Sequence, residues 1–216
     1  LIIIIFLPKY LISFLFILIA ILPCLFLRIL RPIFLVRFAL LPGGTFGDML
    51  LYPALYYCQK KLKINHPQKN YQDLFFIPAK VKICNEFLVK FWKKKLKIFP
   101  PYLIHPLYEA MKIIPGSDVH FIKIFNGERE RDVNNLYEKC QPILSFNEEE
   151  LKKGEETLKK FGLNNKDKFI CLAIRDSAYD KMRISSRFTD WSYQEFRNNN
   201  LDNYNAITKD SGKHFN

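Results

Sequence analysis

The stretch Ile33-Phe-Leu-Val-Arg-Phe-Ala-Leu-Leu41, with the turn Pro42-Gly-Gly-Thr-Phe-Gly-Asp48 that follows it, decides the fold. The first part is rich in branched and aromatic residues and predicts a buried strand. After the turn, Met49 to Lys63 carries apolar residues at helical spacing and predicts a helix. Strand, glycine turn and helix together form the opening of a Rossmann-like unit.

The segments beyond this unit extend the alternation of strands and helices. Further strands are predicted at Asp73–Ile77, His120–Phe125, Pro142–Phe146 and Lys168–Ile174, and helices at Asn85–Lys97, Val133–Cys140 and from about Asp202 to Asp210. Asn147 and Glu150 have the spacing of a capping box at the start of another helix, which Gly162 ends. We therefore expect an α/β fold with a Rossmann-like amino-terminal domain and the start of a second Rossmann-like domain.

The first residues of the chain are strongly apolar. Leu11 to Leu27 contains no charged residue, and Leu1 to Pro8 adds a further apolar run. This length predicts a transmembrane helix, kinked at Pro23, and the arginines after it (Arg28, Arg31 and Arg37) place its carboxyl side in the cytoplasm. A cleaved signal peptide and an interfacial hairpin broken at Pro23 are the alternatives.

Composition leaves several partner classes open. The 216 residues carry a net charge of +12, which favours anionic partners such as nucleic acid, lipid headgroups or phosphorylated substrates. No recognised nucleic-acid motif accompanies that charge, so we expect no nucleic-acid partner. The five cysteines are scattered without a CxxC pair, which predicts reduced, mostly buried thiols. Neither the cysteines nor the four histidines have the spacing of a metal site.

A second informative stretch is Phe169-Ile-Cys-Leu-Ala-Ile-Arg-Asp-Ser-Ala-Tyr179. Its apolar part predicts a buried parallel strand, and its polar part would then lie at the carboxyl edge of the sheet, where open α/β folds bind ligands. Arg175 is the candidate for holding a phosphate group, because a guanidinium matches phosphate in fork geometry. Asp176, Ser177 and Tyr179 offer further polar contacts, and Arg197 and Asn198 follow in a polar loop. The alternative for Arg175 and Asp176 is a salt bridge at a sheet edge.

This combination of a strand, Arg-Asp-Ser-x-Tyr, a polar loop and Arg-Asn resembles a family of bacterial glycosyltransferases. The turn Gly43-Gly44-x-x-Gly47-Asp48 in turn resembles the Gly-x-x-Gly-Asp turn that opens heptosyltransferases of the GT-B fold. The resemblance implies two Rossmann-like domains, no bound metal or other cofactor, and a nucleotide-sugar as substrate. It also implies that Asp48 takes the proton of the acceptor hydroxyl. The alternative for this site is a tight glycine turn with an Asp that caps the helix.

The expected organisation follows from these segments. Residues 1–31 form a membrane anchor, 32–147 an acceptor domain, and 148–216 a linker helix and the start of a nucleotide-sugar-binding domain. We expect a glycosyltransferase at the inner (cytoplasmic) membrane, with its catalytic part facing the cytoplasm. It would transfer a sugar to a hydroxyl of a cell-surface glycan or lipid-linked acceptor. Because the chain stops where the next strand of the second domain should begin, we expect a carboxyl-terminally truncated product with weak or no activity.

Two other functions remain open from the sequence. Lys90, Lys93, Lys94, Lys95 and Lys97 alternate with apolar residues that include Trp92, which predicts a basic amphipathic helix. Such a helix suits an anionic membrane surface, and it supports a non-catalytic, membrane-anchored module that binds lipid or an acidic partner. An ordinary surface helix with one buried stripe is the simpler interpretation. A related transferase that moves pyruvyl or phosphoryl groups is the remaining alternative.

Overall fold

The structure is a computed structural model that describes residues 2–64, 66–122, 132, 135–140, 143–164, 167–175 and 192–204. The chain divides into two compact units, Leu1–Ile143 and Leu144–Asn216. Each unit is described by itself below. The described part of the first unit contains both strands and most of the buried side chains.

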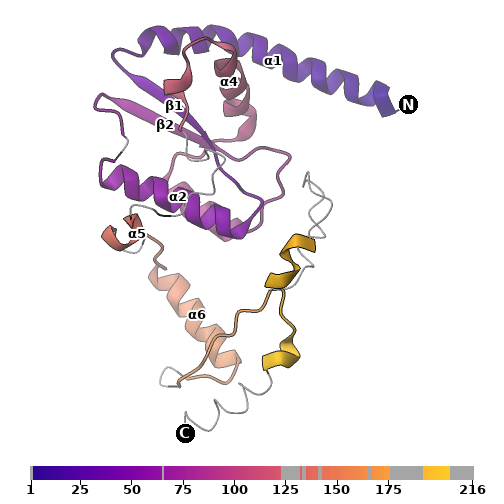
Figure 1. Ribbon diagram of the computed structural model, residues 1–216, viewed down its shortest axis with the longest axis vertical. Coiled ribbons are helices and arrows are strands. Elements are labelled where there is room, and N and C mark those ends of the chain that lie inside the picture. Colours follow the sequence, from indigo (N-terminus) through magenta and orange to yellow (C-terminus); the bar gives the residue numbers. More distant parts are fainter. Residues whose placement is uncertain are drawn as a thin grey trace. The chain divides into compact units, whose positions relative to one another are not determined.

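The first unit is built on two parallel strands joined by a helix (Figure 1). Strand β1 spans Leu35–Leu40, helix α2 spans Phe46–Lys61, and strand β2 spans Tyr71–Phe76. The strands pair in register from Leu35 with Tyr71 to Leu40 with Phe76. The predicted strand, glycine turn, helix and second strand are thus confirmed, although α2 begins earlier than expected, at Phe46.

Two single bridges flank this pair. Phe121 forms a parallel bridge to Phe38 of β1, and Ile98 forms a parallel bridge to Phe75 of β2. The backbone N–H of Ile122 donates to the carbonyl of Phe38 at 2.9 Å. The expected strand His120–Phe125 is therefore reduced to one bridge in its described part, because His120 ends the 3₁₀ turn η1 (Asp118–His120). Residues 123–125 lie outside the described residues.

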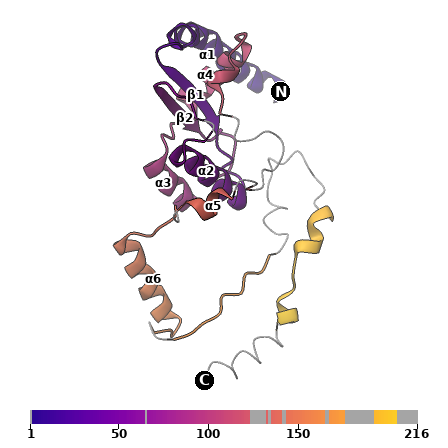
Figure 2. The ribbon, with the colours of Figure 1, turned by 60° about the vertical axis from the view of Figure 1, so that its left-hand side comes forward.

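Helices cover both faces of the strand pair, as Figures 1 and 2 show for this unit. Helix α3 (Glu86–Lys95) lies with α2 on one face, and helix α4 (Pro101–Ile113) lies with α1 (Ile2–Leu30) on the other. The alternation of side chains along the strands explains this arrangement. Ala39 and Phe75 pack into the α2–α3 side, whereas Phe38 and Phe76 pack into the α1–α4 side. The short helix α5 (Leu136–Lys139) packs against α2.

The prediction of a transmembrane helix is wrong. Within the described residues, none of the helices combines the length and apolar character needed to cross a membrane. Helix α1 is instead part of the first unit, because Ala20 and Cys24 are buried against α4 and the sheet. It continues through Pro23 as a single helix, so the hairpin interpretation is also wrong. Arg37, expected to flank a membrane span on its cytoplasmic side, instead lies buried in the middle of β1.

The predicted fold of two Rossmann-like domains is wrong as well. The described residues are mainly helical and contain two strands, both in the first unit. Residues 168–174, expected to form a buried strand, form none, and most of their apolar side chains are exposed, with Phe169 at 53% and Ile170 at 59%. A strand needs a neighbouring strand to satisfy its backbone groups, and this segment pairs with none among the described residues. Residues 143–146 also form no strand.

The described part of the second unit contains one α-helix and two short 3₁₀ turns. Helix α6 spans Glu148–Lys160, and turns η2 and η3 span Ser192–Arg197 and Leu201–Tyr204. The capping box at the start of α6 is confirmed. The N–H of Glu150 donates to Asn147 Oδ1 at 2.8 Å, and the N–H of Asn147 donates to Glu150 Oε2 at 2.9 Å. The predicted helix end at Gly162 is confirmed by its positive φ of 82°. None of the α6 side chains is buried.

Candidate functional site

The glycine turn after β1 is held close to the neighbouring chain. The N–H of Leu41 donates to the carbonyl of Phe76 at 2.8 Å, which extends the parallel ladder by one step beyond β1. The carbonyl of Gly43 then accepts a hydrogen bond from the N–H of Cys84 at 2.8 Å. A Cβ atom on Gly43 would lie only 2.7 Å from Cγ2 of Ile77, so this position requires glycine for close packing. A Cβ on Gly47 would meet no atom within 4 Å.

The predicted acceptor-side residues gather at the start of α2. Thr45 is the N-cap residue, but its side chain does not cap the helix. Its hydroxyl donates instead to Oδ2 of Asp48 at 2.8 Å. Asp48 is half-buried in the first helical turn, where the helix dipole favours a negative charge. The alternative in which Asp48 caps the helix is therefore not supported, because Thr45 is the N-cap residue and its hydroxyl orients the Asp48 carboxylate.

Parallel strands place their carboxyl ends at one edge of a sheet, and ligands of open α/β folds bind at that edge. The structure brings Gly43, Gly44, Gly47 and Asp48 together there, in one turn and the first turn of α2. Thr45 Oγ1 forms the described hydrogen bond to the Asp48 carboxylate, at Oδ2. Oδ1 can therefore accept a proton from a hydroxyl group that approaches this edge.

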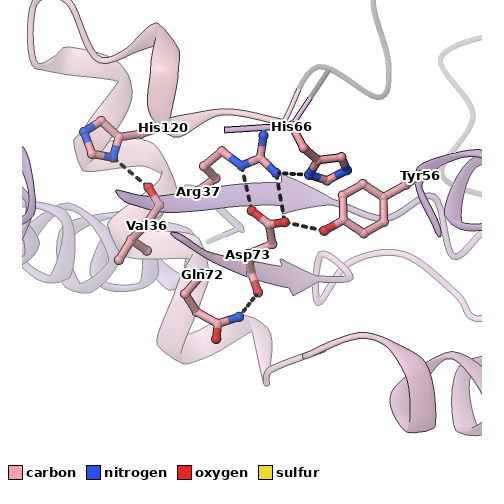
Figure 3. Close-up of polar contacts among 7 residues, drawn as sticks. All are labelled: Val36, Arg37, Tyr56, His66, Gln72, Asp73 and His120. Carbon is pink, nitrogen blue, oxygen red and sulfur yellow. Dashed lines mark hydrogen bonds and ion pairs between the residues drawn. The ribbon is translucent and has the colours of Figure 1, made fainter. Parts of the chain in front are cut away.

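A second polar group lies between β1, β2 and α2, on the α2 side of the strands (Figure 3). Arg37 donates to both carboxylate oxygens of Asp73, from Nε to Oδ1 at 2.7 Å and from Nη2 to Oδ2 at 2.9 Å. The Tyr56 hydroxyl from α2 also donates to Asp73 Oδ2. His66 and Tyr71 complete this group, which we call the Arg37–Asp73 cluster. The guanidinium carbon of Arg37 lies 4.9 Å from the centroid of the Tyr71 ring.

The ionisation states of the Arg37–Asp73 cluster follow from its burial. An arginine only donates, so His66 Nδ1 accepts from Arg37 Nη2 at 3.2 Å and the imidazole is neutral. Burial lowers the pKa of His66, and the Arg37 charge lowers it further. Burial raises the pKa of Tyr56, and the Asp73 carboxylate adds to the rise. The cluster is therefore one buried ion pair surrounded by neutral rings. Arg37 and Asp73 are only 8% and 3% exposed, which indicates a structural role in fixing the strand register.

His120 is a third buried polar residue, at the end of η1 beside β1. It is fully buried, and its Nδ1 donates to the carbonyl of Val36 at 2.7 Å. Its Nε2 has no hydrogen-bond partner among the residues that the structure describes. Burial lowers the pKa of His120, and the nearby charges of Arg28, Arg31 and Lys69 lower it further. The imidazole is therefore neutral at physiological pH.

The donor-side residues lie in the second unit, and only part of this group is described. The backbone N–H of Asn199 donates to the carbonyl of Arg175 at 3.1 Å. This bond brings together the two segments on which the family resemblance depends, although they are distant in sequence. Arg175 and Asn198 are both half-buried. Asp176, Ser177 and Tyr179 lie outside the described residues, as does the side chain of Arg197.

The basic helix α3 is the segment for which the sequence left a membrane-binding role and an ordinary surface helix open. Its apolar side is used by the core of the first unit, where Leu88, Phe91 and Trp92 are buried. The Trp92 indole donates from Nε1 to the carbonyl of Met49 at 2.9 Å. Lys90, Lys93, Lys94, Lys95 and Lys97 remain exposed. The simpler interpretation, a surface helix with one buried stripe, is therefore correct for α3.

The thiols and candidate metal ligands show no further site in the described part of the chain. Cys24, Cys58 and Cys140 are buried free thiols, and Cys171 is an exposed one. Burial raises the pKa of Cys24 to about 11, which makes this thiol unreactive. No group of three or more potential ligands among the described residues is arranged to hold a metal ion.

Sequence reasoning missed the Arg37–Asp73 cluster and the buried His120. Arg37 and Asp73 lie in separate strands, and only the strand register places them opposite one another. The available signal was that Arg37 and Asp73 each interrupt an apolar strand pattern with a charge. A buried charge requires a partner, so the two charges could have been expected to pair.

Comparisons add no relative from which a role could be transferred. The chain matches no protein-family model, no curated protein and no solved structure. The geometry of the Asp48 turn and of the Arg175–Asn199 contact is therefore the basis for a functional proposal.

Proposed function

We propose that this chain is part of a glycosyltransferase that moves a sugar from a nucleotide-sugar to a hydroxyl group of a glycan or lipid-linked acceptor. The observation that carries the proposal is the hydrogen bond between Asn199 N–H and the Arg175 carbonyl. It joins the Arg-Asp-Ser segment to the Arg-Asn segment, which are the two parts of the motif that resembles the transferase family.

Asp48 has the role of general base in this proposal. The acceptor oxygen forms a bond to the anomeric carbon of the sugar, and its proton passes to the Asp48 carboxylate. The bond between the sugar and the diphosphate breaks, and the nucleoside diphosphate leaves with the bonding electrons. The Thr45 hydroxyl supports this role because it fixes the orientation of the carboxylate through Oδ2.

Arg175 has the role of holding the donor phosphates. A guanidinium offers paired donors to phosphate oxygens and stabilises the charge that grows on the leaving group. Asn198 lies next to Asn199 in the segment bonded to Arg175, and its amide suits a sugar or phosphate oxygen. Arg175 and Asn198 are half-buried, and Asn199 and Asn200 beside them are exposed.

Binding of nucleotide-sugars to the full chain tests the donor role. We expect Arg175→Ala to weaken donor binding by roughly tenfold to a hundredfold, since a charge-assisted hydrogen bond contributes about 1.5–3 kcal/mol. Lys152→Ala is the matched control, because it removes one positive charge from an exposed position of α6 in the same unit. Calorimetric titration with a panel of nucleotide-sugars provides the measurement. Equal donor affinity in the wild-type chain and Arg175→Ala would refute the donor role.

A second variant separates the base from donor binding. Asp48→Asn keeps the size of the side chain but removes its basicity. It should leave donor affinity unchanged and lower sugar transfer by about 10²–10⁴-fold. Thr45→Val removes only the hydroxyl that orients Asp48, so a smaller loss is expected. Transfer by Asp48→Asn at the wild-type rate would remove Asp48 from the mechanism.

A further inference from the structure

The last turn of α1 directs a basic side chain toward the interior of the first unit. Arg28 lies one helical turn beyond Cys24 and two turns beyond Ala20, both of which are buried against α4 and the sheet. Helical spacing therefore turns Arg28 to this inner side of α1. Its guanidinium lies beside Gly116, just after α4, where a Cβ atom would collide with Nη2. Arg28 is half-buried in this position.

Two further cations lie where the strands begin. Arg31 lies between α1 and β1, Lys69 precedes β2, and both are half-buried. The ammonium group of Lys69 donates to the carbonyl of Arg31 at 2.7 Å. The backbone N–H of Leu35 donates to the carbonyl of Asn70 at 3.0 Å. These two bonds hold the cationic segments side by side at the amino-terminal edge of the strand pair.

His120 lies behind these cations. It is fully buried, and its Nδ1 donates to the carbonyl of Val36 near the start of β1. Figure 3 shows the Nε2 side of the ring turned away from that carbonyl. Nε2 has no hydrogen-bond partner among the described residues, and a buried polar atom of this kind calls for an explanation. In the neutral ring Nε2 only accepts, whereas protonation makes it a donor. We call this group of four the amino-edge cluster: Arg28, Arg31, Lys69 and His120.

The three cations of the amino-edge cluster have no acidic partner in the described part of the chain. Their charges, together with burial, lower the pKa of His120. Asp118 is close in sequence, but it is exposed and forms no ion pair with them. On α4, His105 and Lys112 both pair with Glu109. Half-buried cations without a counter-charge, beside a buried ring with an unused nitrogen, are the arrangement that an oxyanion completes.

We propose that the amino-edge cluster binds a phosphate or sulfate group, with Arg28, Arg31 and Lys69 as its contacts and His120 as the group behind them that gains a proton on binding. The anion offsets the positive charges that oppose protonation, and the protonated Nε2 then becomes a donor. This site lies at the opposite end of β1 from Asp48, roughly 20 Å away along a strand of this length. It goes beyond sugar transfer and does not depend on the roles of Asp48 and Arg175.

Thermal unfolding of the full chain in sodium sulfate tests the site. Sodium chloride at the same ionic strength is the reference, because it screens charge without offering an oxyanion. We expect sulfate to raise the unfolding midpoint in a saturable way. Arg28→Gln and Arg31→Gln should each weaken sulfate binding about tenfold, since each removes a charge-assisted contact. Lys93→Gln removes the same charge from an exposed position of α3 and should bind like the wild type.

A glycine substitution tests the position of Arg28 at constant net charge. Gly116→Ala places a Cβ atom against the Arg28 guanidinium and should displace it, which we expect to weaken sulfate binding by about tenfold. Gly162→Ala is the matched control, because Gly162 also has a positive φ but no atom lies within 4 Å of its Cβ position. It introduces the same backbone strain and should leave sulfate affinity unchanged. Far-UV circular dichroism of each variant verifies that the helices are retained.

The coupling to His120 is tested through pH. Sulfate keeps its charge between about pH 6 and about pH 8, so a change in its affinity over this range reports on the protein. We expect sulfate to bind severalfold more tightly at the lower pH, and His120→Gln to remove this dependence. Nuclear magnetic resonance of the His120 ring should show that saturating sulfate raises its pKa.

The source of the anion is separated by a second pair of probes. Tighter binding of glycerol 3-phosphate than of inorganic phosphate would support a site for a phosphate monoester, and equal affinities would support a site for the free anion. Either result supports the proposal only if Arg28→Gln weakens the binding.

Two outcomes would overturn the proposal. If sulfate stabilises the chain no more than chloride at equal ionic strength, there is no oxyanion site. If Arg28→Gln and Lys93→Gln lose the same affinity, the effect is one of overall charge. Nucleotide-sugar affinity of Arg28→Gln should equal that of the wild type, so a failure here is distinct from a failure of the proposed function.

Discussion

Replacing Asp73 by alanine is expected to cost more stability than most single substitutions in the first unit. Asp73 accepts two hydrogen bonds from Arg37 and one from Tyr56, and its side chain is 2% exposed. Without the carboxylate, the guanidinium remains buried and unneutralised, because His66 is neutral. Removing one partner of a buried ion pair costs about 3–5 kcal/mol. That is a large share of the roughly 5–15 kcal/mol by which a domain is stable.

The assay is urea unfolding of the full chain followed by far-UV circular dichroism. A triple variant, Arg37→Met/Tyr56→Phe/Asp73→Leu, serves as the comparison because it removes every polar partner at once. It should recover most of the stability lost in Asp73→Ala, since an apolar replacement of a buried pair is often neutral or favourable. The reasoning is refuted if Asp73→Ala unfolds within about 1 kcal/mol of the wild type. It is also refuted if the triple variant is less stable than Asp73→Ala.

Three further predictions concern separate parts of the chain. The stability of the first unit should fall as the pH is lowered through 6.5, the ordinary pKa of histidine. Burial lowers the pKa of His120, so near this pH the unfolded chain takes up a proton that the folded chain does not. Urea unfolding of His120→Gln should show a shallower dependence on pH. Gly43→Ala should destabilise by about 1–3 kcal/mol through the collision with Ile77, whereas Gly47→Ala, with open space at its Cβ, should be neutral or slightly stabilising in thermal unfolding. Asn147→Ala should destabilise the start of α6 by about 1 kcal/mol, because it removes the capping hydrogen bond. Circular dichroism of a peptide spanning residues 144–163 should show lower helicity for this variant. The exposed substitution Lys152→Ala should leave the helicity unchanged.

The unit around β1 could be predicted because its signals are local. A run of branched residues, a glycine turn and a helical stripe all point to the same structure, whereas the register of β1 and β2, which places Arg37 opposite Asp73, appeared only in the structure. Helix α4 was not among the predicted elements. Pro101 occupies its first helical turn, where the ring is favourable, and the helix continues past Pro106.

Other errors came from properties that a local pattern does not contain. The apolar run of residues 169–174 predicts a strand only if another strand lies beside it, and among the described residues none does. The apolar character of α1 is the same for a helix in a bilayer and for one packed on α4, so composition alone did not separate the two. For the candidate site, the sequence named Asp48, Arg175 and Asn198 as candidates, whereas the hydrogen bond between Asn199 and Arg175 appeared only in the structure. The hydroxyl of Thr45, which orients Asp48, appeared only in the structure.

The packing of α1 also has a consequence for biosynthesis. Its inner face is completed by α4, a helix that leaves the ribosome only after β1, α2, β2 and α3 have been made. During that interval both faces of α1 are uncovered, and the nascent chain carries an apolar rod with no tertiary partner. Such exposed surface is where chaperones bind and where chains aggregate during synthesis. The yield of folded protein should therefore depend on how quickly translation reaches Ile113, and slowing it between α1 and α4 is expected to favour aggregation.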